Sequence, residues 1–396
     1  MGQSPPSSTV SESGAAAGLP FLQGNAEFGD IYPAPEQICS APLRRCSRGD
    51  LLISVRAPVG ATNKADQDYC IGRGLAAVTV TTADRDFGWH ALQYAAPRLR
   101  SVAQGTTFEA VGKKELNSLA LLMPSDIREQ GKIGEILDAV DDAIRSTETV
   151  LGKLAQVKQG LVHDLLSRGV DESGGLRDPR RHPEKFTETL VGLRPQSWRV
   201  VPIGTVARVR RGASPRPIAD PRWFAEDGPG WVRISDVSSS RKYLRSTTQR
   251  LSAIGAVRSV PVRPGQVIMS IAATVGESII VDMDARIHDG FVLIDQDQEM
   301  VRSEYLVLAL RSLKQTFVSR GQTGTQANIN SSIVRDTLMC VPDTAEQNKI
   351  VRIVDQHDAN EDATWSSLVK LRALKAGLRD DLLTGRVRVA RTRAAA

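Results

Sequence analysis

A long segment in the middle of this chain recurs at its end. Residues 129–166 (EQGKIGEILDAVDDAIRSTETVLGKLAQVKQGLVHDLL) align without a gap on residues 346–383 (EQNKIVRIVDQHDANEDATWSSLVKLRALKAGLRDDLL). Of the 38 aligned pairs, 17 are identical, whereas chance pairing gives roughly two. The chain therefore contains an internal duplication with a period near 217 residues, and any fold proposed for it has to be built twice.

The regions that precede the two copies also match, more weakly. RGDLLISVRAPVG (48–60) aligns on PGQVIMSIAATVG (264–276), and the string G-x-S-P occurs at residues 2–5 and 212–215. A chain of 396 residues with 41% apolar side chains can bury more than one core. The predicted order is a first domain at 1–128, a first long helix at 129–168, a connector at 169–197, a second domain at 198–345, a second long helix at 346–384 and a tail at 385–396.

Each domain is predicted to be mixed α/β with much loop. Short apolar runs bounded by turn residues indicate strands at 51–55, 75–81, 267–271 and 291–294. Apolar residues at helical spacing indicate helices at 88–103 and 303–319. The connector is polar and rich in Pro and Gly.

The repeated segment has apolar residues at steps of three and four over about five heptads. At 1.5 Å per residue it makes a rod of roughly 57 Å, and its apolar stripe needs a partner, which the second copy supplies. The predicted seam is Ile133, Leu137, Val140, Ile144, Leu151, Leu154, Leu161 and Leu165 against Ile350, Val354, Leu368, Leu371, Leu378 and Leu382. Thr147 and Lys158 complete the first seam, and His357 and Glu361 interrupt the second.

The expected fold class is α+β: two α/β domains separated and joined by two long helices in an antiparallel coiled coil, with a pseudo-two-fold internal repeat. One interpretation of the helix pair is a spacer that holds the two domains at a set distance. The other is a helical hairpin that serves only as core.

Positive charge is concentrated in the second half of the chain. The formal net charge is +6, yet residues 2–128 carry 12 basic and 12 acidic residues. Residues 198–258 carry 12 basic residues and 4 acidic ones, and eleven of the twelve are Arg. Arginine suits phosphates and guanine edges, so the second domain is predicted to meet a polyanion.

The polar residues predicted to contact nucleic acid gather around the G-x-S-P strings and in two loops, 104–114 and 319–332. The candidates are Ser4, Arg56, Thr106, Thr107, Lys113, Lys114, Arg208, Arg210, Arg211, Arg216, Arg320, Gln322, Thr323, Gln326, Asn328 and Asn330. Gly/Asn/Thr loops are also the commonest turns, so a purely structural role stays open for each of them.

No motif for catalysis or metal binding stands out. The four cysteines have no CxxC spacing, the five histidines are dispersed, and a [DN]PP[YF] string, a GxxxxGK[ST] loop and a PD…(D/E)xK pattern are all absent from the sequence. We therefore expect no catalytic residue, no metal and no cofactor in this chain. With no apolar run of membrane-spanning length and no leader-like start, a cytoplasmic location is expected.

Three stretches carry a close resemblance to a known family, over nearly the whole chain. They are GQSPPSSTVSESGAAAGLPFLQG at the start, EQGKIGEILDAVDDAI…KLAQVKQGLVHDLLSRGV followed by GLRDP, and EQNKI…LKAGLRDDLLTGRVRV at the end. The chain resembles the specificity subunit of type I restriction–modification systems. The resemblance implies a noncatalytic subunit whose two target recognition domains read an asymmetric bipartite DNA site. It also implies helices that space the domains and dock two methylation subunits, with restriction subunits joining through the complex. Adenine methylation and ATP-driven cleavage, with S-adenosylmethionine, ATP and Mg²⁺, would belong to the partner chains.

One departure from the repeat concerns the start of the chain. Fourteen residues, 198–211, precede G-x-S-P in the second half, whereas only Met1 precedes it in the first. We expect that the natural protein begins upstream of Met1. Two rival functions remain at this point: a stand-alone DNA methyltransferase or nuclease, which the motifs disfavour, and a coiled-coil adaptor that binds only protein. Replacing Arg208, Arg210 or Arg211 by Ala is expected to weaken DNA binding and flatten its salt dependence.

Overall fold

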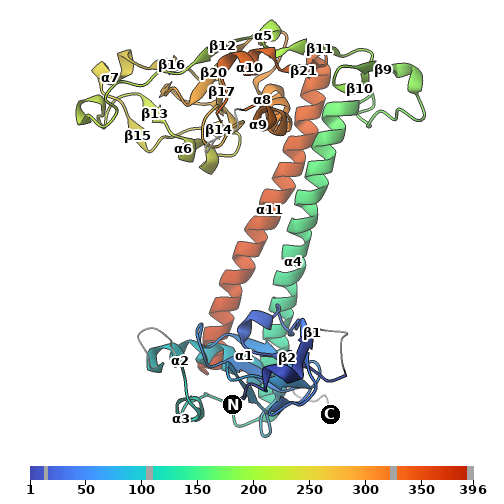
Figure 1. Cartoon of the computed structure of the whole chain (residues 1–396), viewed down its shortest axis with the longest axis vertical. Helices are drawn as coiled ribbons and strands as arrows, with labels where there is room; N and C mark the ends of the chain where they lie inside the picture. Colours follow the sequence, from blue (N-terminus) through green and yellow to red (C-terminus); the bar gives the residue numbers. More distant parts are fainter. Residues whose placement is uncertain (13–16, 104–109, 322–327, 390–396) are drawn as a thin grey trace. The chain divides into compact units, whose positions relative to one another are not determined.

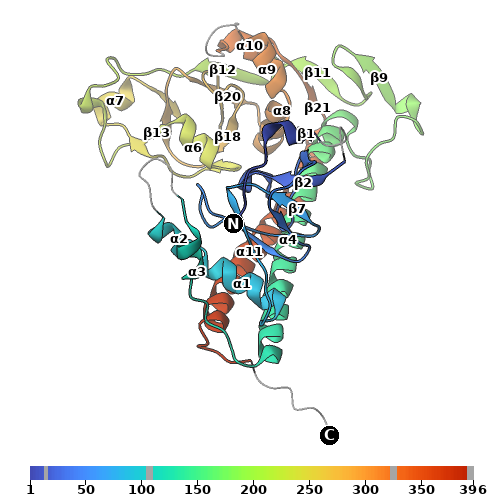
Figure 2. The same cartoon turned by 60° about the horizontal axis from the view of Figure 1, so that its bottom comes forward.

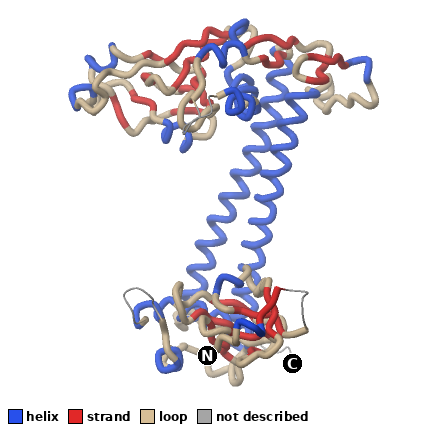
Figure 3. The backbone as a smooth tube through the Cα atoms, viewed as in Figure 1, coloured by secondary structure: helices blue, strands red, loops and turns tan. Residues whose placement is uncertain are grey.

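The computed structural model describes residues 1–12, 17–103, 110–321 and 328–389. Its contacts divide the chain into two compact units: a first unit of residues 1–150 and 364–396, and a second unit of residues 151–363. Two long helices, α4 (Ile127–Arg168) and α11 (Thr344–Leu383), each contribute one part to each unit (Figure 1). Outside them, short strands and helices alternate with long loops (Figure 3).

The described residues of the first unit form two small sheets and three short α-helices. Its strands are β1 (Val10–Glu12), β2 (Leu19–Leu22), β3 (Gln37–Cys39), β4 (Arg45–Cys46), β5 (Leu51–Ser54), β6 (Thr62–Lys64), β7 (Tyr69–Ile71) and β8 (Leu75–Val78). Its helices are α1 (Arg85–Ala95), α2 (Pro97–Val102) and α3 (Lys113–Asn117), with single 3₁₀ turns at Ser7–Thr9 and Asn25–Glu27. The strand orders are β6-β5-β8, all antiparallel, and β1-β3-β2-β7-β4.

The core of the first unit lies on both faces of β5. Leu51 and Ile53 pack with Trp89 and Leu92 of α1, whereas Leu52 packs with residues of β7 on the other face, because successive side chains of a strand point in opposite directions. Phe87 of helix α1 in turn packs with residues of both long helices. Figure 2 shows α1 beside α4 and α11.

The second unit is larger and repeats this plan. Its strands are β9 (Phe186–Thr189), β10 (Gly192–Pro195), β11 (Arg199–Pro202), β12 (Ala207–Arg211), β13 (Gly230–Val232), β14 (Tyr243–Leu244), β15 (Gln249–Arg250), β16 (Val260–Val262), β17 (Val267–Ser270), β18 (Ser278–Val281), β19 (Ala285–Ile287), β20 (Phe291–Gln296) and β21 (Leu338–Val341). Its shorter α-helices are α5 (Ile203–Val206), α6 (Ile234–Ser239), α7 (Ala253–Val257), α8 (Ser303–Ser312), α9 (Lys314–Arg320) and α10 (Ser331–Asp336), and single 3₁₀ turns lie at Pro183–Lys185 and Pro221–Trp223.

A five-stranded sheet, β12-β20-β17-β18-β14, forms the centre of the second unit. One face packs on α8 and on the long helices: Met269 of β17 shares a core with Tyr305 and with Ile350 of α11. The other face packs on a second sheet, β15-β13-β19-β16, through Ile268 and Ile287. Strand β12 is an edge strand of the central sheet.

The repeat predicted from the sequence is therefore visible as structure. β6-β5-β8 in the first unit corresponds to β18-β17-β20 in the second, and the turn that follows β5 matches the turn that follows β17. Ser54 Oγ donates to Pro58 O (2.6 Å) and accepts from Ala61 N (2.8 Å). Ser270 Oγ makes the same pair of bonds in its own turn. Gly60 (φ +86°) and Gly276 (φ +87°) adopt the left-handed backbone that these turns require.

The two long helices pack antiparallel within each unit, and all fourteen predicted seam residues are buried or half-buried. Ion pairs flank the seam at repeat-equivalent places. In the second unit Lys158 Nζ lies 2.5 Å from Asp358 Oδ1, and in the first unit Lys375 Nζ lies 2.5 Å from Asp141 Oδ1. Lys158 also lies 3.4 Å from Glu361 Oε2, so a lysine and a glutamate that interrupt the apolar seam meet each other.

One repeated glutamine joins each domain to the start of its long helix. Gln130 Oε1 accepts from Asp84 N (2.8 Å), and its Nε2 donates to Pro124 O (2.7 Å). Gln347 Oε1 likewise accepts from Arg302 N (2.9 Å), and its Nε2 donates to Pro342 O (2.9 Å). Both side chains are buried, and these bonds satisfy their amide groups.

Two local features differ from what the sequence pattern indicates. The connector is not simply a polar loop, since β9 and β10 pair as an antiparallel hairpin within it. In the first domain, residues 121–124 correspond to β21, which pairs with β11, but no strand pairs with them in the described part of the unit. Leu122 (61% exposed) and Met123 (50% exposed) consequently face solvent.

No helix in the described part of the chain is both long enough and apolar enough to cross a membrane.

Candidate DNA interface

The G-x-S-P string of the second unit is held against the turn between β19 and β20. Gly212 N donates to Phe291 O (2.9 Å), and Ala213 N donates to Ile287 O (3.2 Å). A Cβ atom on Gly212 would lie 2.1 Å from His288 O, so only glycine allows this approach. The result is that Ser214 and Arg216 lie beside the 288–290 turn.

Asp289 organises the polar groups at this turn. Ser214 Oγ donates to Asp289 Oδ1 (2.6 Å), and Arg216 Nη2 lies 2.7 Å from Asp289 Oδ2. Arg211 Nε donates to the backbone oxygen of Asp289 (2.9 Å). Burial acts to raise the pKa of the Asp289 carboxyl, but the Ser214 hydrogen bond and the Arg216 charge outweigh it and hold that pKa below its ordinary value. Asp289 is therefore a carboxylate at neutral pH.

A surface hollow opens next to these groups, and we call it the second cradle. It is lined by Arg211, Ile271, Ala272, His288, Asp289, Gly290, Asn328, Ile329, Asn330 and Ile333. Asn330 caps helix α10: its Oδ1 accepts from Ile333 N (2.9 Å) and Ser332 Oγ (2.6 Å), which leaves the amide nitrogen as the group it can offer a ligand. The cradle thus combines arginine and amide donors with one carboxylate.

His288 lines the cradle but is built into the fold. Its ring lies 4.8 Å from Phe291 and 5.7 Å from Trp231, and its Nδ1 accepts from Gly290 N (2.9 Å). Burial lowers its pKa, and the opposing charge of Asp289 does not reverse that direction. A neutral ring committed to its own turn fits a structural role and not a general acid or base.

The first unit contains the same backbone arrangement, which we call the first cradle. Gly2 N donates to Leu75 O (2.8 Å), and Gln3 N donates to Ile71 O (3.0 Å). Arg73 N lies 3.4 Å from Ser4 Oγ, matching the 3.5 Å between Asp289 N and Ser214 Oγ. The G-x-S-P strings therefore have the same structural role in both units.

The walls of the two cradles correspond as well. Val55 N donates to Gly74 O (2.9 Å), as Ile271 N does to Gly290 O (2.8 Å). Val111 N donates to Val55 O (2.9 Å), as Ile329 N does to Ile271 O (2.9 Å). Isolated bridges join Arg56 to Ala110 and Ala272 to Asn328. By this equivalence, the first-cradle counterparts of Ala272, Asp289, Asn328 and Asn330 are Arg56, Arg73, Ala110 and Gly112.

The first cradle is consequently richer in cations. Arg56 and Arg73 are exposed, and no described residue makes a hydrogen bond or ion pair with either side chain. Lys113 and Lys114 open helix α3, at the positions that Ser331 and Ser332 occupy in α10. The first cradle thus has four cationic side chains in or beside it, together with the Glu115 carboxylate, which accepts from Gly112 N (3.0 Å). In the second cradle, Asp289 stands at the position of Arg73.

The structure brings some of the predicted contact residues together and separates others. Arg211, Arg216, Asn328 and Asn330 meet at the second cradle, and Ser4, Arg56, Lys113 and Lys114 belong to or border the first. Arg320 instead donates to Thr337 Oγ1 (3.3 Å), away from the cradle lining. Thr106, Thr107, Gln322, Thr323 and Gln326 lie outside the described residues.

The three arginines of β12 do not act on one surface. Arg211 pairs with Val292 in the register of β20 and lies on the α10 side, where it reaches the cradle. Arg208 and Arg210 project from the opposite face, because side chains alternate along a strand. The sequence grouped them by composition, which carries no information about strand faces.

This separation yields a prediction about the salt dependence of DNA binding. Arg211→Ala is expected to weaken binding and to reduce the slope of log K against log salt by about 0.9, the value of one lost phosphate contact. Arg208→Ala with Arg210→Ala is expected to leave the slope nearly unchanged, since both side chains lie on the other face of β12. Fluorescence anisotropy with a labelled duplex at several salt concentrations measures both. Equal slopes for the two variants would contradict the assignment.

Asp289 and Arg73 were not among the residues expected to contact DNA. The signal for them was present in the repeat, because the offset of 216 that aligns Gly74 with Gly290 also aligns Arg73 with Asp289. In the described residues, no group of three or more His, Cys, Asp or Glu side chains is arranged to hold a metal ion.

Comparisons with known proteins agree with this architecture. The family model described as the type I restriction modification DNA specificity domain matches residues 44–158 and again 195–365, one match per half of the duplication. A curated relative from Methanocaldococcus jannaschii, named as the specificity subunit of the MjaX type I restriction enzyme, is 40% identical over 169 residues. That match covers 42% of this chain and 39% of the relative, so the chain spans about two fifths of that relative's length.

Two solved structures share the fold at low sequence identity. One was determined in a study of complex assembly and conformational transition of a type I R-M system; it has a TM-score of 0.60 and 17% identity, over 93% of this chain and 92% of that one. The other is a type I restriction–modification S subunit from M. genitalium, with a TM-score of 0.54 and 15% identity over 96% and 92% of the two chains. With both halves of the duplication matched by the family model, the chain belongs to the type I restriction modification DNA specificity domain family.

Proposed function

We propose that this chain is the sequence-specific DNA-binding subunit of a type I restriction–modification enzyme and reads an asymmetric bipartite site. The observation that carries the proposal is the pair of cradles, which repeat one backbone arrangement and present different polar side chains. A duplicated scaffold with divergent contact groups suits a site made of two different halves, because base edges are distinguished by their patterns of donors and acceptors.

The helix pair suits the role of a spacer in this proposal. DNA rises about 3.4 Å per base pair along each strand, so a rod of fixed length translates into a set gap between two half-sites, as in dimeric DNA readers. Helices α4 and α11 take part in both units, and their seam is apolar along most of its length. The alternative function, an adaptor that binds only protein, does not explain why both units present polar side chains at their cradles.

The chemistry of restriction and modification is assigned to partner chains. We propose that two methylation subunits dock on the long helices and that restriction subunits join through the complex. S-adenosylmethionine, ATP and Mg²⁺ would be bound by those partners, and this chain would act in the cytoplasm, where it meets DNA. Its own contribution is to hold polar groups in place on two scaffolds.

Selection from a random duplex pool tests the function. The full chain, co-expressed with the methylation subunits of its own system, is incubated with random duplexes, and the retained DNA is sequenced. We expect enrichment of two different short sequences separated by a constant number of unspecified base pairs. Retention without any enriched sequence, or enrichment of a single continuous site, would contradict the proposal. Methylation of adenine by the chain alone would instead favour a stand-alone enzyme.

A further inference from the structure

The two cradles differ in charge at one corresponding position. Arg73 follows β7 and precedes Gly74 in the first cradle, and Asp289 follows β19 and precedes Gly290 in the second. Their backbone nitrogens lie 3.4 and 3.5 Å from the serine Oγ of the corresponding G-x-S-P string. One is an arginine and the other an aspartate. A side-chain difference on an otherwise matched backbone is the simplest structural source of a difference in ligand preference.

Asp289 offers acceptors to the second cradle. Ser214 and Arg216 each occupy one carboxylate oxygen, and every carboxylate oxygen can accept more than one hydrogen bond. The side chain is 39% exposed and lines the hollow, so its remaining lone pairs are open to a ligand. Among base edges in the major groove, the exocyclic amino groups of cytosine and adenine are the donors that such a carboxylate can recognise.

Arg73 offers only donors to the first cradle. Its guanidinium has no partner among the described residues, and Arg56 belongs to the neighbouring segment of the same cradle. A planar guanidinium matches the paired acceptors O6 and N7 of guanine, and an aspartate at the same place would be repelled by them. The two residues therefore favour opposite hydrogen-bonding patterns.

We propose that residues 73 and 289 determine base preference in the two half-sites: Arg73 selects guanine in one, and Asp289 selects a base with an exocyclic amino group in the other. The proposal rests on the proposed function and deepens it. Asp289 has a second effect, since it orients Arg216 and partly neutralises the arginines beside it.

Charge-exchange variants test the proposal in the duplex selection described above. The variants are Arg73→Asp and Asp289→Arg, together with Asp289→Asn, which keeps the size of the side chain and an acceptor for Ser214. The controls are Arg181→Asp and Glu188→Arg, exposed residues of the connector that change the net charge by the same amounts. An unfolding midpoint measured for each variant shows that the chain remains folded.

Each exchange is expected to change one half-site and leave the other intact. Arg73→Asp should reduce guanine enrichment at one position roughly tenfold or more, and Asp289→Arg should do the same to the amino-bearing base in the other half-site. Asp289→Asn keeps an acceptor and adds a donor, so it should shift that position towards adenine and away from cytosine. The controls should change neither. The inference is overturned if both half-sites keep their preferences in Arg73→Asp and in Asp289→Arg, or if either exchange alters both half-sites alike. A wild-type chain that enriches no bipartite site would refute the proposed function itself, which is a separate outcome.

Discussion

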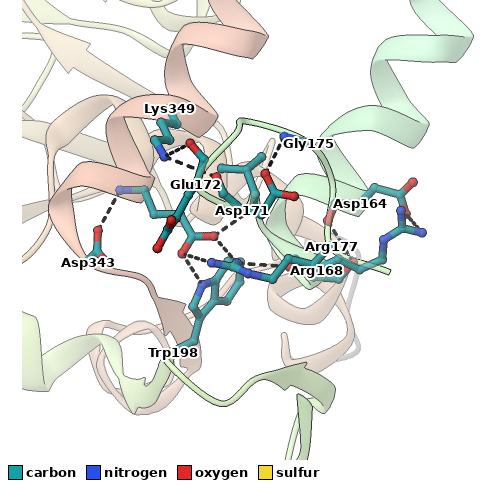
Figure 4. Close-up of polar contacts among 12 residues, drawn as sticks. Asp164, Arg168, Asp171, Glu172, Gly175, Arg177, Trp198, Asp343 and Lys349 are labelled. Carbon is teal, nitrogen blue, oxygen red and sulfur yellow. Dashed lines mark hydrogen bonds and ion pairs between the residues drawn. The ribbon is translucent and has the colours of Figure 1, made fainter. Parts of the chain in front are cut away.

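Glu346→Ala is expected to destabilise the second unit by about 3 kcal/mol, the scale on which a buried ion pair responds to the loss of one partner. Glu346 is 7% exposed at the start of α11, and Arg177, 18% exposed, contacts both of its oxygens. Trp198 Nε1 donates to the same carboxylate (3.1 Å), as does Val170 N (2.9 Å). Figure 4 shows Arg177 and Trp198 converging on this point from separate segments. The variant removes the acceptor of the Trp198 indole N–H and of the Val170 backbone N–H, and it leaves the Arg177 guanidinium without its carboxylate partner.

Urea unfolding followed by tryptophan fluorescence measures this effect, since Trp198, Trp223 and Trp231 all report on the second unit. Glu188→Ala, on an exposed position of β9, is the matched control and should leave the transition unchanged. Hydrogen exchange of the Val170 amide gives a local measurement, because that amide loses its acceptor. If the free energy of unfolding is unchanged and the Val170 amide stays protected, the carboxylate is not what joins the connector to α11.

The second large effect concerns the gap between half-sites. Inserting one heptad into α4 after Val150, and one into α11 before Thr364, lengthens both helices by roughly 10.5 Å, which corresponds to about three base pairs. The selected gap is expected to grow by that number while both half-site sequences stay the same. Binding should also weaken, because about three base pairs turn the half-sites by roughly a third of a helical turn relative to each other.

A four-residue insertion in α4 alone serves as the comparison. It breaks the heptad register of one helix against the other, so we expect weak binding with no single preferred gap. Selection from the random duplex pool measures both insertion variants alongside the wild-type chain. An unchanged gap after the paired heptad insertion would show that the helices serve only as core and do not set the spacing.

Glu129 and Glu346 show how far the repeat carries a prediction. The alignment matches them, but it does not say what either one binds. In the structure Arg388, from the segment after α11, pairs with Glu129 at 2.6 and 2.5 Å, and Arg177, from the segment after α4, pairs with Glu346. In each unit, an arginine that follows one long helix meets a glutamate at the start of the other. The two partners of these ion pairs are 169 and 259 positions apart in the sequence. A local sequence pattern therefore cannot predict that they meet.

The duplication, the long helices and their seam were determined by the sequence alone, because identity at a constant offset and apolar residues at helical spacing are local, periodic signals. The family resemblance followed from the same motifs, and the family match confirms it.

The composition of the cradles was decided only by the tertiary structure. Each one joins a G-x-S-P string, a turn between strands and the segment before a short helix, which are separated by long stretches of chain. Which β12 arginine reaches the second cradle depends on the face of the strand from which its side chain projects. The hydrogen bonds of the Asp289 carboxylate come from Ser214 and Arg216, which belong to a segment distant in sequence. The sequence therefore determined how many times the scaffold is built, and the packing of distant segments decided which side chains each copy presents.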